Sequence, residues 1–94
     1  MLIVLCTLEL HIPAASSLKS KRQVLRSVID RLRADFNIAV AEVAQQDAHQ
    51  LATLAVVSVS NDRAYLDGLI QRVVTFVEGA HQDLVLLGYE VELL

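Results

Sequence analysis

The chain has 94 residues and a formal net charge of −3, with 54% hydrophobic and 20% charged residues. This length suits one domain with a single layered core, and the composition excludes a disordered or low-complexity chain. The single cysteine excludes an intramolecular disulfide and cysteine-rich zinc sites, and it fits a reducing compartment. With 4% aromatic residues and no tryptophan, an extended platform for stacking bases is also excluded.

The opening segment reads as a strand. Even positions from residue 2 to residue 12 are all apolar, whereas the odd positions turn polar from Thr7 onward. A period of two with one uniform face predicts a strand whose even side faces the core, ended by Pro13. The apolar opening lacks a basic flank and reaches Glu9 too soon for a signal peptide or a membrane span, so we expect a cytoplasmic protein.

A helical period follows over residues 18–36, with Ser17 as the expected N-cap and Asn37 expected in the left-handed conformation at the end. Two short segments rich in valine and alanine, 37–43 and 51–60, predict strands.

A second helix is predicted over residues 62–78, capped by Asn61 or Ser60 and closed by Gly79. The last segment, 83–94, alternates again. We expect its core side to carry one set of apolar residues, namely Val85, Leu87, Tyr89, Val91 and Leu93.

The predicted order is β-α-β-β-α-β, which is the ferredoxin-like α+β arrangement. Right-handed crossovers place both helices on one face of an antiparallel sheet with strand order 4-1-3-2. The other sheet face is then uncovered, and apolar residues on it are expected to offer a surface for a homodimer. The residues expected there are Ile3, Leu5, Leu84 and Leu86.

Positive charge is concentrated in residues 16–33, which hold six of the eight lysines and arginines of an acidic chain. On a helix, Arg22, Arg26 and Arg33 fall on one flank of the apolar stripe with Lys19 close by. Cations at the positive end of a helix dipole disfavour the helix, yet they make a receiver for phosphate together with free N–H groups. The candidate residues for phosphate or RNA are Ser17, Lys19, Lys21, Arg22, Arg26 and Arg33.

A purely structural interpretation of these cations stays open. Charged runs on amphipathic helices are commonly solvated faces, and Asp30 is spaced to pair with Arg26 and Arg33. Lys21 points nearly toward the apolar stripe, so it can instead pair with a carboxylate near a strand end.

The polar connection between the two middle strands is a candidate recognition loop, with Gln46, Asp47, His49 and Gln50 as its side chains. The alternative is a hydrated hairpin end. No cofactor and no metal site are expected, because the three histidines are isolated from one another and from the cysteine. Cys6 lies on the core side of a strand and lacks a base, so no nucleophile is expected.

Several segments together resemble the bacterial YlxP-like family of unknown function, over nearly the whole chain. They are "LELHIP", "SLKSKRQVLRSVIDRLRADFN", "AEVAQQD", "VVSVSNDRAYLD", "FVE" and "YEVELL". The chain departs from the family after "QD", where members often carry tryptophan or another bulky residue and this chain has "AHQ". The resemblance implies a ferredoxin-like fold. It also implies a gene neighbourhood, because genes of this family often lie between those for a translation initiation factor and ribosome-binding factor A.

From these observations we expect a non-enzymatic accessory protein that binds ribosomal RNA or a ribosomal particle through the basic helix. No membrane and no DNA partner are expected. A homodimeric interaction module and a small-anion-binding regulatory domain are the alternatives.

Overall fold

Six elements follow one another in the order expected from the sequence, and the computed structural model describes all residues from 1 to 94. They are β1 (Leu2–His11), α1 (Leu18–Asp35), β2 (Ala39–Ala44), β3 (Leu51–Ser60), α2 (Arg63–Glu78) and β4 (Val85–Leu93).

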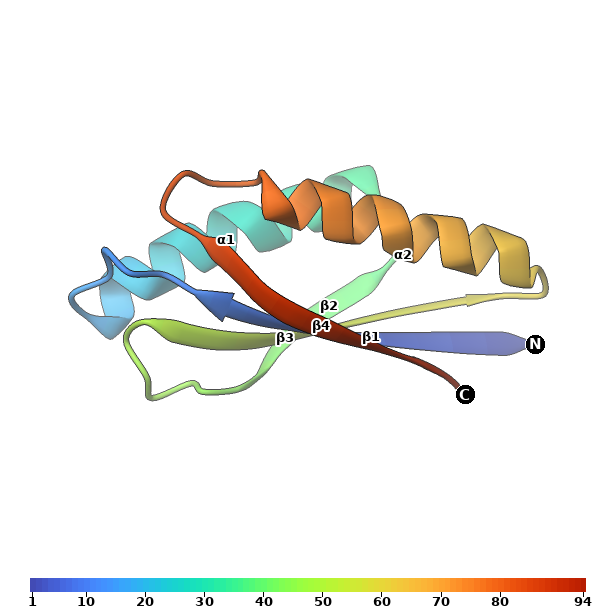
Figure 1. Cartoon of the computed structure of the whole chain (residues 1–94), viewed down its shortest axis with the longest axis horizontal. Helices are drawn as coiled ribbons and strands as arrows, with labels where there is room; N and C mark the ends of the chain where they lie inside the picture. The colour runs from blue at the N-terminus through green and yellow to red at the C-terminus, as the bar shows by residue number, and fades with distance from the viewer.

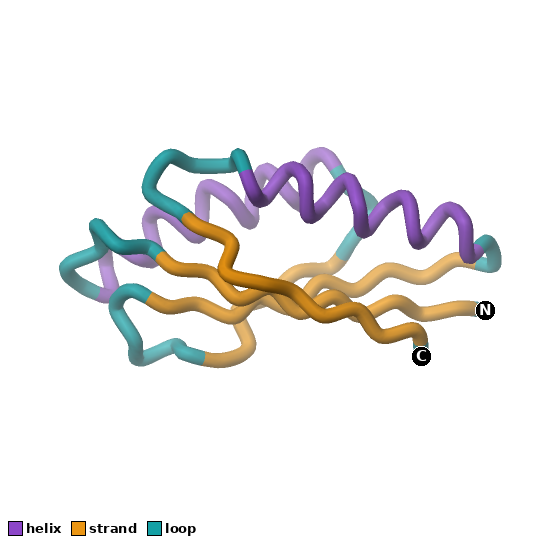
Figure 2. Tube along the Cα trace, viewed as in Figure 1, coloured by secondary structure: helices purple, strands orange, loops and turns teal.

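The strands form one sheet in the order β2-β3-β1-β4, in which every neighbouring pair is antiparallel. Both helices lie on the same side of this sheet, and the opposite side carries no helix (Figures 1 and 2). The predicted ferredoxin-like α+β fold is therefore confirmed, including its strand order.

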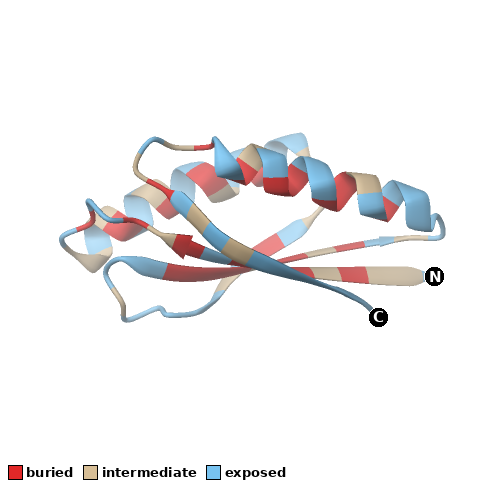
Figure 3. Ribbon diagram, in the orientation of Figure 1, coloured by how far each residue is buried: buried red, intermediate tan, exposed pale blue.

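The core lies between the sheet and the two helices (Figure 3). The even positions of β1 face it as the alternation predicted. Val4, Cys6, Leu8 and Leu10, and Ile12 directly after the strand, are each at most 2% exposed. Leu25, Val28 and Leu32 of α1 belong to the same core and cover these residues from the helix side of the sheet. No helix of the chain combines the length and apolar character needed to cross a membrane.

The helix ends agree with the sequence in part. Ser17 is the N-cap of α1 as expected, but α2 is capped by Asp62, whose carboxylate accepts a hydrogen bond from the Tyr65 N–H. The expected left-handed Asn37 is wrong, because Gln45 is the one non-glycine residue with a positive φ. The chain instead leaves α1 through an extended Phe36.

The last strand changes its face partway along. Its register against β1 shifts between Glu9 and Leu10, so that Leu87 is an extra, bulged residue. Leu86 thus lies opposite Leu10 on the core side, and Val85 lies opposite His11 on the uncovered side. A one-residue bulge inverts the alternation, so the expectation that Val85 faces the core is wrong.

Beyond this bulge the strand follows the predicted phase. Tyr89, Val91 and Leu93 lie opposite core residues of β1 and hence on the helix side. They are nevertheless 41–47% exposed, because β4 is an edge strand.

Candidate functional site

The serines at the N-terminus of α1 form hydrogen bonds with one another. The Ser17 hydroxyl accepts a hydrogen bond from the Ser20 N–H, and the Ser20 hydroxyl accepts bonds from the N–H groups of Ser16 and Ser17. These serines form a reciprocal capping box, so their polar groups already have partners within the chain. The expected phosphate contact by Ser17 thus gains no support from the local geometry.

Lys21 lies inside the protein and not on its surface. Its side chain is 0% exposed, and its ammonium donates to Glu42 Oε2 at 3.0 Å, to the Gln45 carbonyl at 2.9 Å and to the Leu51 carbonyl at 3.1 Å. The Gln46 carbonyl lies 3.5 Å away. These acceptors satisfy the three donors of an ammonium. The expectation that Lys21 contacts phosphate is wrong, whereas its alternative role as the partner of a strand-end carboxylate is confirmed.

Arg31, on the opposite flank of α1, joins the two helices. Its guanidinium donates to the Ala80 carbonyl at 2.7 Å and lies 4.8 Å from the centre of the Phe76 ring. This cation therefore has a structural partner on the α2 side, and it lies away from the flank that carries the other arginines.

Three arginines predicted to share one flank of α1 do so. Arg22, Arg26 and Arg33 line a groove of about 340 Å³ between this helix and β2, together with Asp30 and other residues. The complete lining is Arg22, Leu25, Arg26, Ile29, Asp30, Arg33 and Glu42. Leu25 and Ile29 form its apolar floor, and α1 carries Lys19 on the same flank, a turn before Arg22.

The cations of this groove are not neutralised by direct ion pairs. No carboxylate lies within 4.0 Å of Lys19, Arg22, Arg26 or Arg33, and the pairing expected for Asp30 is absent. Arg33 has one internal contact, a hydrogen bond of 2.9 Å to the Val40 carbonyl. The guanidinium groups of Arg22 and Arg26 have no hydrogen-bond partner in the chain, so their donors are available to a ligand.

The loop between β2 and β3 is held by contacts to its backbone. Lys21 binds the carbonyl groups at the two ends of the loop, and the Gln50 amide donates to the carbonyls of Pro13 and Ala15 at 3.1 and 3.4 Å. Two of the predicted recognition residues therefore have partners within the chain. The amide of Gln50 helps to hold the loop, and the amide of Gln46 donates a 3.5 Å hydrogen bond to the Glu42 carbonyl.

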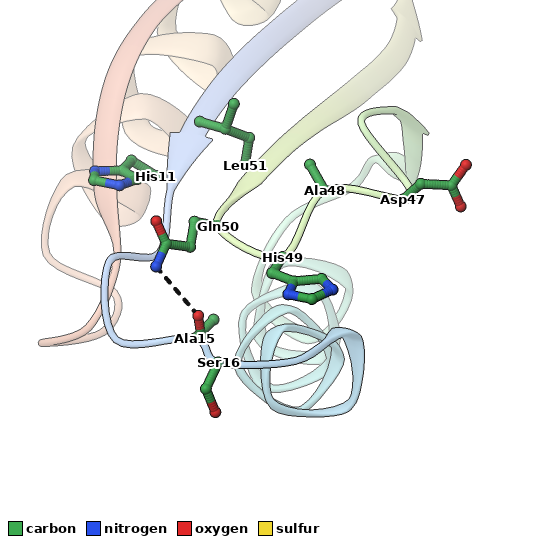
Figure 4. A pocket seen from close by; sticks show the side chains of 8 residues that line it. All are labelled: His11, Ala15, Ser16, Asp47, Ala48, His49, Gln50 and Leu51. Carbon is green, nitrogen blue, oxygen red and sulfur yellow. Dashed lines mark hydrogen bonds between the residues drawn. The ribbon is translucent and has the colours of Figure 1, made fainter.

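Of the predicted recognition residues, all of which are exposed, His49 and Asp47 are the two whose side chains make no hydrogen bond within the chain. Figure 4 shows them at an open cavity of about 700 Å³, with His49 beside the start of α1 and Asp47 pointing away from the other lining residues. Sequence reasoning missed His11 and Ser16, which line the same cavity from β1 and from the segment before α1. The register of β1 with β3 brings His11 opposite Leu51, and no local motif signals this pairing.

The uncovered sheet face differs from its expected composition. Ile3 and Leu5 lie on it, opposite Val59 and Val57 of β3. Leu84 is 4% exposed and belongs to the core, and Leu86 packs against the core from the helix side. The prediction of these two leucines on the open face is therefore wrong, because the bulge at Leu87 reverses the alternation on which it rested.

The single cysteine lies in the core. Cys6 is 0% exposed, and desolvation by burial raises the pKa of its thiol to about 11. The thiol is therefore protonated at neutral pH and out of reach of a substrate. No group of three metal-binding side chains comes together in the structure.

The model of a protein family described as "Protein of unknown function (DUF503)" matches residues 3–91. The chain belongs to this family. It is also 34% identical to the "Uncharacterized protein YlxP" of Bacillus subtilis (strain 168) over 64 residues, which are 68% of this chain and 70% of that protein.

Two solved structures resemble the fold. A de novo designed protein, Foldit4, superposes with a TM-score of 0.56 at 9% identity, covering 100% of this chain and 97% of the design. An antibiotic biosynthesis monooxygenase superposes with a TM-score of 0.50 at 20% identity, covering 100% of this chain and 96% of that one. At such identities the likeness concerns the fold alone.

Proposed function

We propose that this protein is a non-enzymatic accessory factor that binds ribosomal RNA or a ribosomal particle through the groove beside α1. The observation that carries the proposal is the set of arginines Arg22, Arg26 and Arg33 along one groove without a carboxylate in ion-pair distance. Guanidinium groups bind phosphate with paired hydrogen bonds, and an unneutralised row of them attracts a polyanion.

The geometry suits a backbone and not a single anion. From Lys19 to Arg33 the helix rises about 21 Å at roughly 1.5 Å per residue, so the cations follow a line and do not converge on one point. A line of cations matches the repeated charges of a nucleic-acid strand. The exposed loop side chains Asp47 and His49 are candidates for shape-dependent contacts next to this line.

A salt titration tests the proposal. Binding of fluorescently labelled ribosomal RNA fragments should weaken with salt, with a slope of roughly −2 to −3 in log K against log salt for three to four phosphate contacts. Replacing Arg22→Ala and Arg26→Ala together should reduce this slope by about 1.5.

The matched control removes two cations from the other helix, Arg63→Ala and Arg72→Ala. Both residues are exposed on α2, so this variant has the same net charge but keeps the groove. An equal loss of binding in both double variants would show that net charge alone drives the interaction. Absence of RNA binding at low salt would refute the proposal.

A second candidate is a homodimer across the uncovered sheet face. Ile3 and Leu5 adjoin Val57 and Val59 there, and Val59 is 53% exposed. Sedimentation velocity at micromolar concentration tests this candidate, with a Val59→Glu variant expected to dissociate the dimer. A wild-type protein that sediments as a monomer removes it.

A further inference from the structure

The two edges of the sheet are protected to different degrees. At the β2 edge the strand has six residues, a register shift after Glu42, and an outer carbonyl, that of Val40, already bound by Arg33. Short length, bulges and occupied backbone groups are the features that protect an edge from further pairing.

The β4 edge lacks most of these features. This strand has nine residues, no proline and no lysine or arginine, and its single bulge lies near its start. No element pairs with its outer side. Its last part is exposed along its whole length, as the pale-blue end of the ribbon in Figure 3 shows.

The backbone of β4 presents unpaired groups at regular intervals. Ile3 and Leu94 exchange both of their backbone hydrogen bonds, at 2.7 and 3.4 Å. Because bonded and non-bonded pairs alternate along an antiparallel ladder, the N–H and C=O groups of Tyr89, Val91 and Leu93 point away from β1. These groups form a template for one more strand.

The side chains of this edge differ between the two faces of the sheet. Tyr89, Val91 and Leu93 give an apolar row on the helix side. Glu90 and Glu92 lie opposite Thr7 and Leu5, so they give an acidic row on the uncovered side. None of the four strands contains a lysine or arginine that would offset this row.

We propose that β4 is a docking edge for an extended segment of a partner protein, in which apolar residues alternate with lysine or arginine. Such a segment extends the sheet by one strand and matches both rows, since its cations face Glu90 and Glu92 and its apolar residues face Tyr89, Val91 and Leu93. This surface is separate from the arginine groove, which lies at the opposite edge beside β2.

A second copy of the chain fits this edge less well. If two β4 strands paired about a two-fold axis at Glu90, Val91 or Glu92, the antiparallel register would set a glutamate of each copy opposite a glutamate of the other. Like charges directly opposite destabilise a pair of strands. Charge complementarity therefore favours a basic segment as the occupant.

The test uses two fluorescently labelled peptides of the length of β4. In one, valine alternates with lysine, and in the other valine alternates with glutamate. By anisotropy, the lysine peptide should bind the full-length protein, and the glutamate peptide should bind at least about tenfold more weakly, a difference of about 1.4 kcal/mol.

Two variants separate backbone pairing from charge. Val91→Pro removes one outward N–H without breaking a bond to β1, and it should weaken binding of the lysine peptide about tenfold. Glu90→Lys with Glu92→Lys should reverse the preference between the two peptides. The control, Asp35→Lys with Glu78→Lys, changes the net charge equally at exposed helix ends and should alter binding by less than about twofold at about 0.15 M salt.

Three outcomes of the peptide experiments would overturn the proposal. They are equal binding of both peptides, equal effects of the two charge-reversal variants, and absence of peptide binding. A wild-type dimer that dissociates on Val91→Pro would also overturn it, because the occupant of the edge would then be a second copy of the chain.

Discussion

Lys21 and Arg22 carry the same charge and are adjacent in the chain, yet they belong to different parts of the molecule. Lys21 is enclosed between α1 and the sheet by Glu42 and three carbonyls, whereas Arg22 is exposed in the groove between the flank of α1 and β2. A rotation of about 100° per residue separates them. A cluster of cations in a sequence therefore has to be divided by helical position before a function is assigned to it.

Of the two cations, the buried Lys21 is expected to contribute far more to stability than Arg22, so its substitution should have the largest effect. Lys21→Ala leaves the Glu42 carboxylate and buried carbonyls without a donor, so it should cost about 3–5 kcal/mol of unfolding free energy. Urea denaturation followed by circular dichroism measures this loss. A companion variant, Lys21→Met with Glu42→Gln, should recover part of it, since no unpaired charge is left. A cost below about 1 kcal/mol for Lys21→Ala would show that the interior ion pair is unimportant.

The second interior group, Cys6, should make stability depend on alkaline pH. Its pKa is raised from 9.0 to about 11 in the folded state, so its contribution is complete below pH 9.0 and is lost as the pH rises toward about 11. The loss should reach roughly 2–3 kcal/mol, because the unfolded chain releases the proton first. Urea titrations across this range measure it. The Cys6→Ala variant should lack the same component of the pH dependence, and identical slopes for both proteins would contradict the assignment.

Arg31 lies between the two extremes, at the boundary of the helices. Arg31→Ala removes its bond to the Ala80 carbonyl and its contact with the Phe76 ring, and it should cost about 1–2 kcal/mol. Thermal unfolding measures this effect. Arg63→Ala is the control, because Arg63 has only an exposed ion pair of 3.9 Å with Asp67. Equal shifts in both variants would show that the contact between the helices contributes nothing.

The smallest effect is expected in the groove. Arg22→Ala and Arg26→Ala should change the unfolding free energy by less than about 0.5 kcal/mol each, because neither side chain has a partner in the chain. Chemical denaturation of both single variants tests this. A destabilisation of about 2 kcal/mol or more would mean that these arginines serve the fold, and it would remove the physical basis of the proposed RNA interface.

The general architecture could be predicted from the sequence because its signals are long and regular. The alternation in β1 and the helical period of α1 each persist over many residues, so the burial pattern and the element order agree with them. The face of β4 could not be predicted in the same way. Leu86 and Leu87 are both apolar, so their polarity does not reveal the extra residue that inverts the alternation between them. The local signal of the bulge is Gly88, because a glycine inside a strand pattern often marks one, but it does not say which leucine is the extra residue.

The candidate site could be predicted in part for a related reason. The shared flank of Arg22, Arg26 and Arg33 follows from helical spacing alone. The interior position of Lys21 also agrees with its place near the apolar stripe. Its charge, however, favours a surface position, because burying an unpaired charge costs free energy. What compensates that charge is the Glu42 carboxylate of β2 together with carbonyls of the following loop and of β3, and these groups come together only in the folded chain.

The way in which Lys21 holds the loop between β2 and β3 has a consequence for the variation of that loop. Apart from Glu42, the ammonium binds main-chain oxygens, and every amino acid supplies such an oxygen whatever its side chain. The path of the loop is thus largely independent of the identities of residues 46–49, so this segment can exchange its surface chemistry while keeping its shape. For protein engineering, it is a natural place to graft foreign recognition sequences onto a preserved scaffold.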